Sequence, residues 1–428
     1  MIFFRVTGNI NIKTTDGTMV NYYKFRRPSN LNNETAYIST YDDYNDLKGV
    51  FKRIDKDKFF TRLLNEDKIR NLEGFPIELG ISNYNEYTKT QECESEYFLE
   101  DTIIDLYKQL KVIDKEEVKL VIIGSLGKTI SEMIASSTAL RILHSKLKEI
   151  YKTIKIDLYL NASNNSFYSR DKSIYEKLNF IENIYPLSIS VKTFTQYDYF
   201  IDTSSFINSA YFKELNYVDA WLYKFGIDYK KIKDNLKFNE IDLSKVTIKK
   251  QITEKINKAK EKGKLLLYHP YSANLKKSIP QTYAIDILKK LLKENEDYVI
   301  VSALNIDSKI KDEMFLDLSK DSKSLTEFMY IISQMNSVLT VDTATFHISD
   351  SFMIPTVAIF NNEEYEKETK YYPFVKSIRV YDESKNLSKF IFDNEDLTIY
   401  KFESWKKLKI SKIIKLLESF WYNRKLID

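Results

Sequence analysis

The chain has 428 residues, of which 43% are hydrophobic and 14% aromatic, and its 65 basic and 61 acidic residues leave a net charge of +4. This composition predicts a folded protein. The chain is longer than most chains with a single hydrophobic core, so we expect two domains and an appendage. So small a positive surplus argues against a dedicated nucleic-acid-binding protein, and we expect no nucleic-acid partner.

Cysteine and histidine are too few for the common metal sites. Cys93 is the only cysteine, which excludes an internal disulfide and a multi-cysteine metal site. The three histidines, His144, His269 and His347, lack the paired spacing of metal ligands. The first residues contain no signal-peptide core, and no stretch reaches the roughly 18 apolar residues of a transmembrane helix. We therefore expect a cytoplasmic protein with no metal, no cofactor and no transmembrane segment.

The N-terminal part of the chain, residues 1–115, has the weakest pattern. An Asp-Gly pair at 16–17 separates the β-rich segments 9–14 and 18–25, which predicts a β-hairpin. Residues 28–95 are polar and aromatic with little periodicity. We interpret residues 1–115 as an accessory region of hairpin plus mixed structure, either a packing appendage or a domain for an acceptor or a partner.

A βαβ unit follows this region. Strand Val118–Ile123 leads into a turn with two glycines at 124–129, and a helix from Ile130 to Tyr151 precedes strand Ile156–Leu160. The glycines permit close approach of the backbone to a ligand. The turn ends in Gly-Lys-Thr like an ATP-binding Walker motif, but the first glycine of that motif would fall on Ile122, inside the strand. We therefore exclude an ATPase of this kind.

The first half continues with less regular elements. We expect a helix at Tyr175–Phe180 and a buried strand at Tyr197–Ile201 that ends in the polar run Asp202–Ser205. Residues Phe206–Phe225 have helical periodicity, and the charged segment 228–262 contains the linker to the second half.

The second half alternates strands and helices. Strand Lys264–Tyr268 runs into a polar loop at 269–277, and Gln281–Glu294 has the apolar stripe of an amphipathic helix. Tyr298–Leu304 is the next strand, and Leu325–Met335 is the next helix. Repeated β-α-β units predict a parallel, doubly wound sheet.

The stretch Ser337–Phe360 completes this pattern. A buried strand, Val338–Val341, ends in the polar turn Asp342–Thr345, and a short helix and a second strand, Thr356–Phe360, follow. The turn lies at the carboxyl end of its strand, where open α/β sheets bind ligands, and a helix start suits a diphosphate. Alternatively, the turn only caps its own helix.

The C-terminal segment Lys406–Arg424 is a basic amphipathic helix. We expect it to pack back on the fold, and a peripheral contact with an anionic membrane is the alternative. The resulting domains are two Rossmann-like domains, at 116–250 and 251–400, and the C-terminal helix at 401–428.

Four segments resemble the heptosyltransferases, glycosyltransferase family 9. Leu120–Leu140 is similar to the first strand, Ser-Leu-Gly turn and helix of the family, and Tyr197–Ser204 (YDYFIDTS) to its strand with two aspartates. His269–Pro280 (HPYSANLKKSIP) resembles the strand-end His-Pro and the basic residue before a proline. Val341–Phe360 resembles the Asp-Thr, His and Pro-Thr-Val run. The resemblance covers about 118–360.

This resemblance implies an α/β GT-B fold with two Rossmann-like domains facing a cleft, in which 116–250 is the N-terminal acceptor domain and 251–400 is the C-terminal nucleotide-sugar-binding domain. It also implies inverting, metal-independent sugar transfer from a nucleoside-diphosphate sugar, typically ADP-heptose. A departing diphosphate needs its charge stabilised, which helix-start amides, hydroxyls and a lysine can do. The candidates for nucleotide-sugar binding are Ser272, Lys276, Lys277, Asp342, Thr343, Ala344, Thr345 and His347. Lys277 is the expected cation for the diphosphate, and Lys276 is the alternative to it. Asp342 is expected to orient the turn. His347 either faces the site or only caps the helix.

One position departs from the family. Lys128 stands where the family has the aspartate taken to be the general base, and a lysine is protonated at neutral pH unless strongly desolvated. Glu132 or Asp202 could take the proton of the acceptor instead. Lys128 could also bind an anionic donor or acceptor.

These patterns together favour a glycosyltransferase that acts on a cell-surface glycan or a protein. The alternative is a non-catalytic glycosyltransferase-like subunit that binds a glycan or stabilises an active partner, and Lys128 is its main support. A nucleotide-sugar epimerase of the same fold is a third interpretation.

Overall fold

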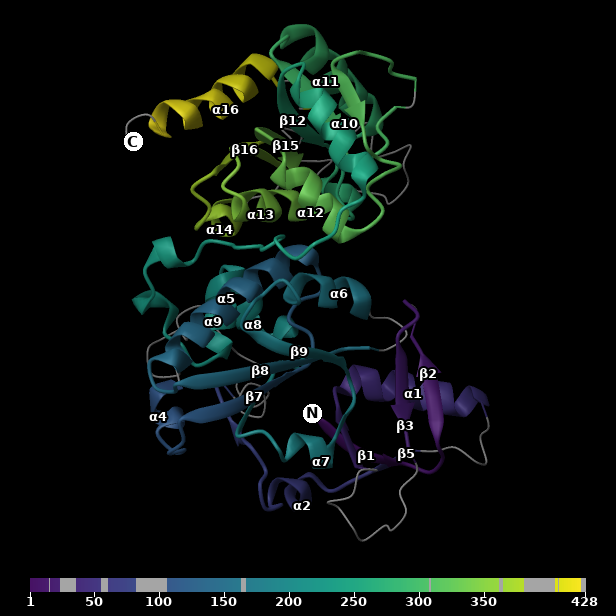
Figure 1. Cartoon of the computed structure of the whole chain (residues 1–428), viewed down its shortest axis with the longest axis vertical. Helices are drawn as coiled ribbons and strands as arrows, with labels where there is room; N and C mark the ends of the chain where they lie inside the picture. The colour runs from purple at the N-terminus through teal and green to yellow at the C-terminus, as the bar shows by residue number, and fades with distance from the viewer. Residues whose placement is uncertain are drawn as a thin grey trace, which may run out of the picture. The chain divides into compact units, whose positions relative to one another are not determined.

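The computed structural model describes residues 1–14, 16–23, 36–54, 61–81, 106–162, 167–307, 309–361, 365–380, 405–406 and 408–424. They form two compact units, Met1–Lys237 and Phe238–Asp428, and each unit has a parallel sheet of its own (Figure 1). Among these residues, no helix combines the length and the apolar character needed to cross a membrane. The predicted pair of Rossmann-like halves is confirmed. Cys93 lies outside the described residues.

The first unit is built on a five-stranded parallel sheet. In spatial order its strands are β6 (Ile77–Glu78), β11 (Tyr199–Asp202), β7 (Glu117–Ile123), β8 (Thr153–Leu160) and β9 (Ile181–Pro186). Helix α5 (Ile130–Lys148) packs with α9 (Tyr217–Lys224) on one face of this sheet (Figure 1). From Leu120 onward β7 is buried, which explains its continuous apolar run.

The accessory region covers the opposite face of this sheet. The region supplies strands β4 (Ala36–Ser39), β1 (Ile2–Val6) and β5 (Thr61–Leu63) of an antiparallel sheet and the short helix α2 (Glu66–Arg70). The segment after β9 adds the edge strand β10 (Ile189–Ser190), which pairs with β4, and helix α7 (Val191–Phe194). Phe3, Ile38 and Phe194 share one core cluster with Val121 and Phe200 of the parallel sheet. Residues before position 115 are therefore part of the core of the first unit.

The hairpin predicted at 16–17 is present. Strands β2 (Ile10–Lys13) and β3 (Met19–Tyr22) pair in antiparallel register, and Gly17 has a φ of 89°. A glycine adopts this left-handed conformation without strain. The remaining described helices of the region are α1 (Tyr41–Ile54) and α4 (Leu106–Leu110).

The second unit has a six-stranded parallel sheet. In spatial order its strands are β14 (Phe315–Asp317), β13 (Tyr298–Ser302), β12 (Lys264–His269), β15 (Ser337–Val341), β16 (Thr356–Phe360) and β17 (Val375–Arg379). Strand β15 is buried along its whole length, as its β-branched sequence predicts. The edge strands β14 and β17 are only partly apolar, and the sequence patterns did not indicate them.

Helices cover both faces of this sheet. Helices α11 (Gln281–Glu294) and α16 (Ile410–Arg424) share a core cluster with the sheet, in which Leu288 and Ile413 are buried. The predicted packing of the C-terminal helix onto the fold is thus confirmed. Helices α12 (Leu325–Ser333) and α13 (Ala344–Ser351) lie across β15 from α16 (Figure 1).

Two helical predictions for the first unit are wrong in position or length. Helix α6 (Tyr168–Tyr175) ends where the helix at Tyr175–Phe180 was expected to begin. The segment Phe206–Phe225 is broken into η3 (Phe206–Asn208), α8 (Ala210–Glu214) and α9. The side chains of Ser209 and Asn216 accept hydrogen bonds from backbone amides and start the new helices, because such residues compete with a continuous helix.

The charged segment 228–262 contains more structure than predicted. Helix α10 (Lys250–Lys260) buries Ile252, Ile256 and Ala259 at helical spacing. Two short 3₁₀ turns precede it, η4 (Tyr229–Lys231) and η5 (Asp234–Leu236). The apolar spacing was a signal for α10 that the high density of charged residues obscured.

Candidate functional site

The candidate site of the second unit lies where the strand order of its sheet reverses. Along the chain, β13 and β14 are added on one side of β12, whereas β15, β16 and β17 are added on its other side. The loops after β12 and β15 therefore diverge, and ligands bind open α/β sheets at this position. The predicted loop 269–277 and turn 342–345 follow these two strands.

The start of helix α13 is open. Thr343 is its N-cap residue with extended backbone, φ −160°, but the Thr343 side chain makes no capping hydrogen bond. The first amides of a helix have no partner within the helix, and the positive end of its dipole lies there. The amides of Ala344 and Thr345 can therefore donate to an anion.

Three polar atoms on α13 are buried without a hydrogen-bond partner among the described residues. They are Oγ1 of Thr345 and Nε2 of His347, both in residues that are 0% exposed, and Oδ1 of Asp350 near the end of the helix. The other ring nitrogen of His347, Nδ1, lies 2.6 Å from the hydroxyl of Tyr372. Burial, with a smaller effect of the Lys277 charge, lowers the pKa of His347 to about 3, so its ring is neutral at physiological pH.

Lys277 lies between two buried carboxylates. It belongs to η6 (Leu275–Lys277), and its Nζ is 2.6 Å from Oδ2 of Asp342 and 3.8 Å from Oε1 of Glu368. Glu368 belongs to helix α14 (Tyr365–Thr369), which follows β16. The sequence predicted Lys277 and Asp342 but missed Glu368, because no motif links α14 to the other two segments.

The turn that carries Lys277 satisfies its own polar groups. The hydroxyl of Ser272 accepts a hydrogen bond from the amide of Asn274, at 3.3 Å, and Asn274 in turn caps the amide of Lys276. Lys276 is exposed, and its carbonyl accepts a hydrogen bond from the side chain of Asn361. The structure thus favours Lys277 over Lys276 as the lysine of the site.

Two further buried groups of the second unit are held in uncharged forms. Burial lowers the pKa of His269, the last residue of β12, to about 4. Burial raises the pKa of Asp350, near the end of α13, to about 8, although a hydrogen bond from Asn239 lowers it. No sequence pattern indicated Asp350, because its burial depends on the packing of α13.

The start of helix α5 in the first unit is closed. Thr129 and Glu132 form a capping box, in which Glu132 Oε2 accepts from the amides of Lys128, at 2.5 Å, and Thr129, at 3.2 Å. The side-chain ammonium of Lys128 is exposed and donates to Oδ1 of Asn208, at 2.8 Å. The carboxylate of Glu132 already occupies the position that an anion would take.

The two glycines of this turn approach other parts of the chain. A Cβ on Gly124 would lie 2.8 Å from Oγ1 of Thr203, and one on Gly127 would lie 2.8 Å from Cβ of Glu132. Both glycines have positive φ, 114° and 155°. The close backbone approach that the sequence predicted therefore serves packing within the first unit.

Asp202, at the end of β11, is fully engaged. Its Oδ2 is 3.0 Å from the amino group of Met1, and its Oδ1 accepts from the amide of Ser204, at 2.9 Å. Burial raises the pKa of Asp202, but the ammonium groups of Met1 and Lys224 and the Ser204 hydroxyl outweigh burial and bring the pKa below its usual value. A carboxylate held in this way is a weak proton acceptor.

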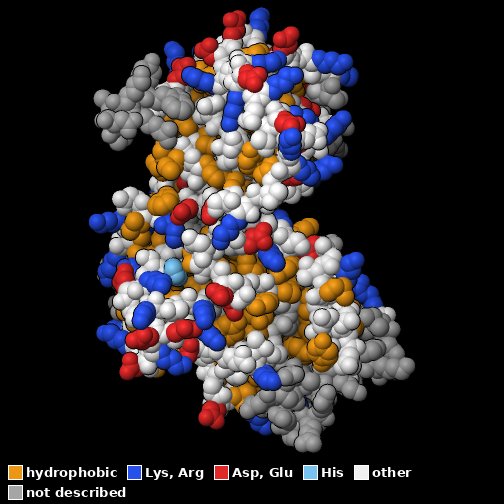
Figure 2. Space-filling model, viewed as in Figure 1, with side chains coloured by type: hydrophobic (Ala, Val, Ile, Leu, Met, Phe, Trp, Pro, Cys, Tyr) orange, Lys and Arg blue, Asp and Glu red, His pale blue; other side chains and the backbone are white. Residues whose placement is uncertain are grey.

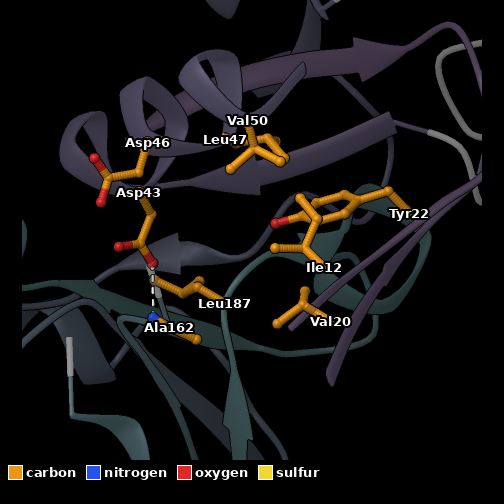
Figure 3. A pocket seen from close by; sticks show the side chains of 9 residues that line it. All are labelled: Ile12, Val20, Tyr22, Asp43, Asp46, Leu47, Val50, Ala162 and Leu187. Carbon is orange, nitrogen blue, oxygen red and sulfur yellow. Dashed lines mark hydrogen bonds between the residues drawn. The ribbon is translucent and has the colours of Figure 1, made fainter. Parts of the chain in front are cut away.

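The accessory region also closes over the ends of β8 and β9, where it forms a pocket (Figure 3). Oδ2 of Asp43 accepts a hydrogen bond from the amide of Ala162, at 2.9 Å, which anchors α1 to the chain after β8. The side chains that line the pocket are Ile12, Val20, Tyr22, Asp43, Asp46, Leu47, Val50, Ala162 and Leu187. Three strand ends of the first sheet, those of β11, β8 and β9, are therefore in contact with residues of the accessory region.

The surface has no dominant charge on the face that Figure 2 shows. Basic and acidic side chains are interspersed over both units, as the small net charge implies.

In the part of the chain that the structure describes, no group of three or more His, Cys, Asp or Glu side chains is arranged to hold a metal ion.

No family model and no curated protein matches this chain. Several solved structures are similar to it. A family 9 glycosyltransferase from Veillonella parvula is 11% identical, with a TM-score of 0.49 over 72% of this chain and 98% of that chain. Escherichia coli ADP-heptose lipopolysaccharide heptosyltransferase II is 12% identical, with a TM-score of 0.48 over 72% and 99%. The E. coli heptosyltransferase WaaC with ADP is 10% identical, with a TM-score of 0.43 over 61% and 93%.

Heptosyltransferases, which the sequence resembles, are among these solved structures. Their TM-scores are below 0.5 and their identities are 10–12%, so the chemistry has to be argued from the residues of this chain. The two Rossmann-like units rest on the two parallel sheets of the chain itself.

Proposed function

We propose that the chain is a glycosyltransferase that takes a nucleoside-diphosphate sugar as its donor. The sugar is heptose-like, and the resemblance in sequence favours ADP-heptose. The acceptor is a cell-surface glycan or a protein, and transfer is inverting and independent of a metal. We also propose that the protein is located in the cytoplasm. In this proposal the basic outer side of α16 makes a peripheral contact with a membrane.

The observation that carries the proposal is the open start of α13 at the reversal point of the second sheet. The amides of Ala344 and Thr345 are uncapped by Thr343, and the buried hydroxyl of Thr345 has no partner in the described structure. A leaving diphosphate needs donors of this kind, because negative charge develops on it as the glycosidic bond breaks. The other helix start that follows a candidate turn, that of α5, is already occupied by Glu132.

The proton acceptor for this reaction is the open part of the proposal. We keep Glu132, Asp202 and Lys128 as candidate catalytic residues, but Glu132 caps α5, Asp202 is paired with Met1, and Lys128 binds Asn208. A carboxylate that releases its present partners when the acceptor binds would serve as the base.

These engaged carboxylates also favour a second candidate function. A chain that binds a nucleotide sugar or a glycan without transferring it needs no base, and it could stabilise an active partner. The exposed ammonium of Lys128, where the family has its acidic residue, supports this alternative.

Thermal unfolding with nucleotides tests the donor site. We would measure the unfolding midpoint of the whole chain with ADP, UDP, GDP and TDP, each with and without a chelator. A ligand at about 100 times its Kd that binds only the folded state adds about 2.7 kcal/mol to the free energy of unfolding. A selective increase with one nucleotide supports the proposal, and no increase with any of the four contradicts it. Release of sugar from the donor only when acceptor is added then separates transfer from binding alone.

A further inference from the structure

One edge of the first parallel sheet is left open on the face that the accessory region covers. Strand β9 forms this edge beside β8, and helices α5 and α6 pack on the other face of these strands (Figure 1). The accessory region closes over the inner strands, where Phe3 shares a core cluster with Val121 and Phe200. Tyr159 of β8 also belongs to this cluster, but none of the described residues of β9 does. Side chains that β9 turns to this face therefore remain accessible, and Tyr185 is 40% exposed.

Two cross-strand pairs lie at this open edge. Asp157 of β8 is opposite Asn183 of β9, and Tyr159 is opposite Tyr185. Residues two apart on a strand point to the same face and are about 7 Å apart, so the polar pair and the aromatic pair are neighbours on one surface. The rings of Tyr159 and Tyr185 are in contact, with their centroids 5.0 Å apart. The edge thus presents an accessible aromatic ring directly beside hydrogen-bonding groups.

The polar pair is held in a fixed orientation and has capacity for further hydrogen bonds. Oδ2 of Asp157 accepts from the hydroxyl of Tyr197, at 2.5 Å, and Oδ1 accepts from the side-chain amide of Asn183, at 3.0 Å. Burial and the hydrogen bond to Asp157 raise the pKa of Tyr197, so its hydroxyl keeps its proton and acts as the donor. A carboxylate has about four acceptor positions, and Asn183 keeps its carbonyl oxygen and a second amide hydrogen, so the pair can both accept and donate further.

An aromatic ring beside such a polar pair matches the chemistry of a carbohydrate. A sugar ring packs its C–H groups on an aromatic face, while the hydroxyls around it need both acceptors and donors. A nucleic acid would bring its phosphates close to the carboxylate of Asp157, which favours a neutral ligand.

We infer that the β8–β9 edge is a glycan-binding platform: a neutral sugar ring stacks on Tyr185, and its hydroxyls bind Asp157 and Asn183. No residue of the candidate donor site or candidate base belongs to this platform. It goes beyond the proposed function, because it requires neither a nucleotide nor transfer of a sugar. In a glycosyltransferase it would hold a part of a glycan acceptor remote from the reacting hydroxyl.

Affinity electrophoresis of the whole chain tests the platform. The protein is run in native gels that contain dextran, mannan, galactan or hydroxyethyl cellulose, four polysaccharides without charge. The retardation at increasing polysaccharide concentration gives a Kd for each of them. We expect the wild type to be retarded by at least one of the four.

Variants of β9 identify the platform as the binding surface. Tyr185→Ala should raise the Kd of the retarding polysaccharide at least about tenfold, because the stacking ring is lost. Tyr185→Phe keeps the ring and should stay within about threefold of the wild type. Asn183→Ala removes hydrogen bonds to the sugar and should raise the Kd about threefold to tenfold.

Tyr41→Ala is the matched control. Tyr41 begins α1 in the same unit and is 62% exposed, so its truncation removes a tyrosine ring from the surface without altering the β8–β9 edge. This variant should bind polysaccharide like the wild type. Urea unfolding of each variant shows whether it is folded.

Three results would overturn the inference. They are the absence of retardation of the wild type by all four polysaccharides, equal Kd values for the wild type and Tyr185→Ala, and an equal loss of binding in Tyr41→Ala. The wild-type measurement and Tyr185→Phe keep the test valid if Tyr185→Ala does not fold. Nucleotide binding is measured separately, so a failure of the platform leaves the donor site standing, and the reverse also holds.

Discussion

The ammonium of Lys277 and the carboxylate of Asp342 meet at 2.6 Å, although they follow different strands of the second sheet. Asp342 is buried, and Lys277 reaches it from the solvent side. The lysine that the sequence indicated as a mobile cation for a diphosphate is therefore already paired before a ligand binds. A donor has to share this lysine with two carboxylates.

Lys277→Met should lower the free energy of unfolding by about 1–2 kcal/mol. The variant leaves the buried Asp342 without its ammonium, and the partial exposure of Lys277 limits the loss. Urea unfolding of Lys277→Met, Asp342→Asn and the double variant would measure the coupling between the two side chains. Strictly additive effects would show that the ion pair contributes nothing.

Thr345→Val should weaken nucleotide binding without weakening the fold. The hydroxyl of Thr345 has no partner in the described structure, so its removal costs no hydrogen bond and could raise the free energy of unfolding slightly. Loss of one hydrogen bond to the ligand should raise the Kd of the preferred nucleotide by about fivefold to tenfold. Calorimetric titration and urea unfolding would measure the two effects.

Thr340→Val is the control for this variant. Thr340 is buried on β15, and its hydroxyl donates to the carbonyl of Val341 instead of facing the start of α13. It should change stability and leave the nucleotide Kd unaltered. Equal Kd values for wild type and Thr345→Val would remove Thr345 from the site.

Glu132→Gln separates capping from catalysis. A glutamine at this position of a capping box can still accept from the helix-start amides, so the free energy of unfolding should change little. Glu132→Ala should lose about 1 kcal/mol, because the amides of Lys128 and Thr129 lose their acceptor. Loss of sugar transfer with unchanged nucleotide binding in Glu132→Gln would identify Glu132 as the base, whereas wild-type transfer would leave Glu132 the role of a helix cap alone.

Asp350 should make stability fall as the pH rises. Burial raises its pKa from the ordinary 3.8 to about 8 in the folded chain, so the folded state keeps a proton that the unfolded state releases. The contribution of this proton to stability is complete below pH 4 and is lost as the pH rises to about 8. Relative to Asp350→Asn, the wild type should lose about 1–3 kcal/mol between pH 5 and pH 8, measured by urea unfolding. Parallel pH profiles would contradict the assignment.

Ile413→Ala should destabilise the chain by about 2–5 kcal/mol. Ile413 is fully buried in the core cluster that joins α16 to α11 and the sheet, so its truncation leaves a cavity. Lys412→Ala on the same helix is exposed and should change the free energy of unfolding by less than about 0.5 kcal/mol. Similar unfolding midpoints for Ile413→Ala and wild type would show that α16 is not part of the folded core.

The elements whose signals are local could be predicted from the amino-acid sequence. The apolar stripe of Gln281–Glu294 and the strand-turn-helix-strand pattern of Ser337–Phe360 agree with α11, β15, α13 and β16, because periodicity and turn residues act over a few positions. The capping box of Thr129 and Glu132 is also local, and its Thr-x-x-Glu spacing was available in the sequence although it was interpreted as catalytic.

Contacts between side chains that are distant in the sequence depend on the packing of the whole fold. Spacing along the chain does not encode the order of strands in a sheet, and it is the order β12-β15-β16 that brings Lys277, Asp342 and Glu368 together. The pairing of Asp202 with Met1 likewise depends on how the accessory region packs across the first sheet. Burial, which sets the charge states of His347 and Asp350, exists only once these layers have assembled, because desolvation is a property of the packed core.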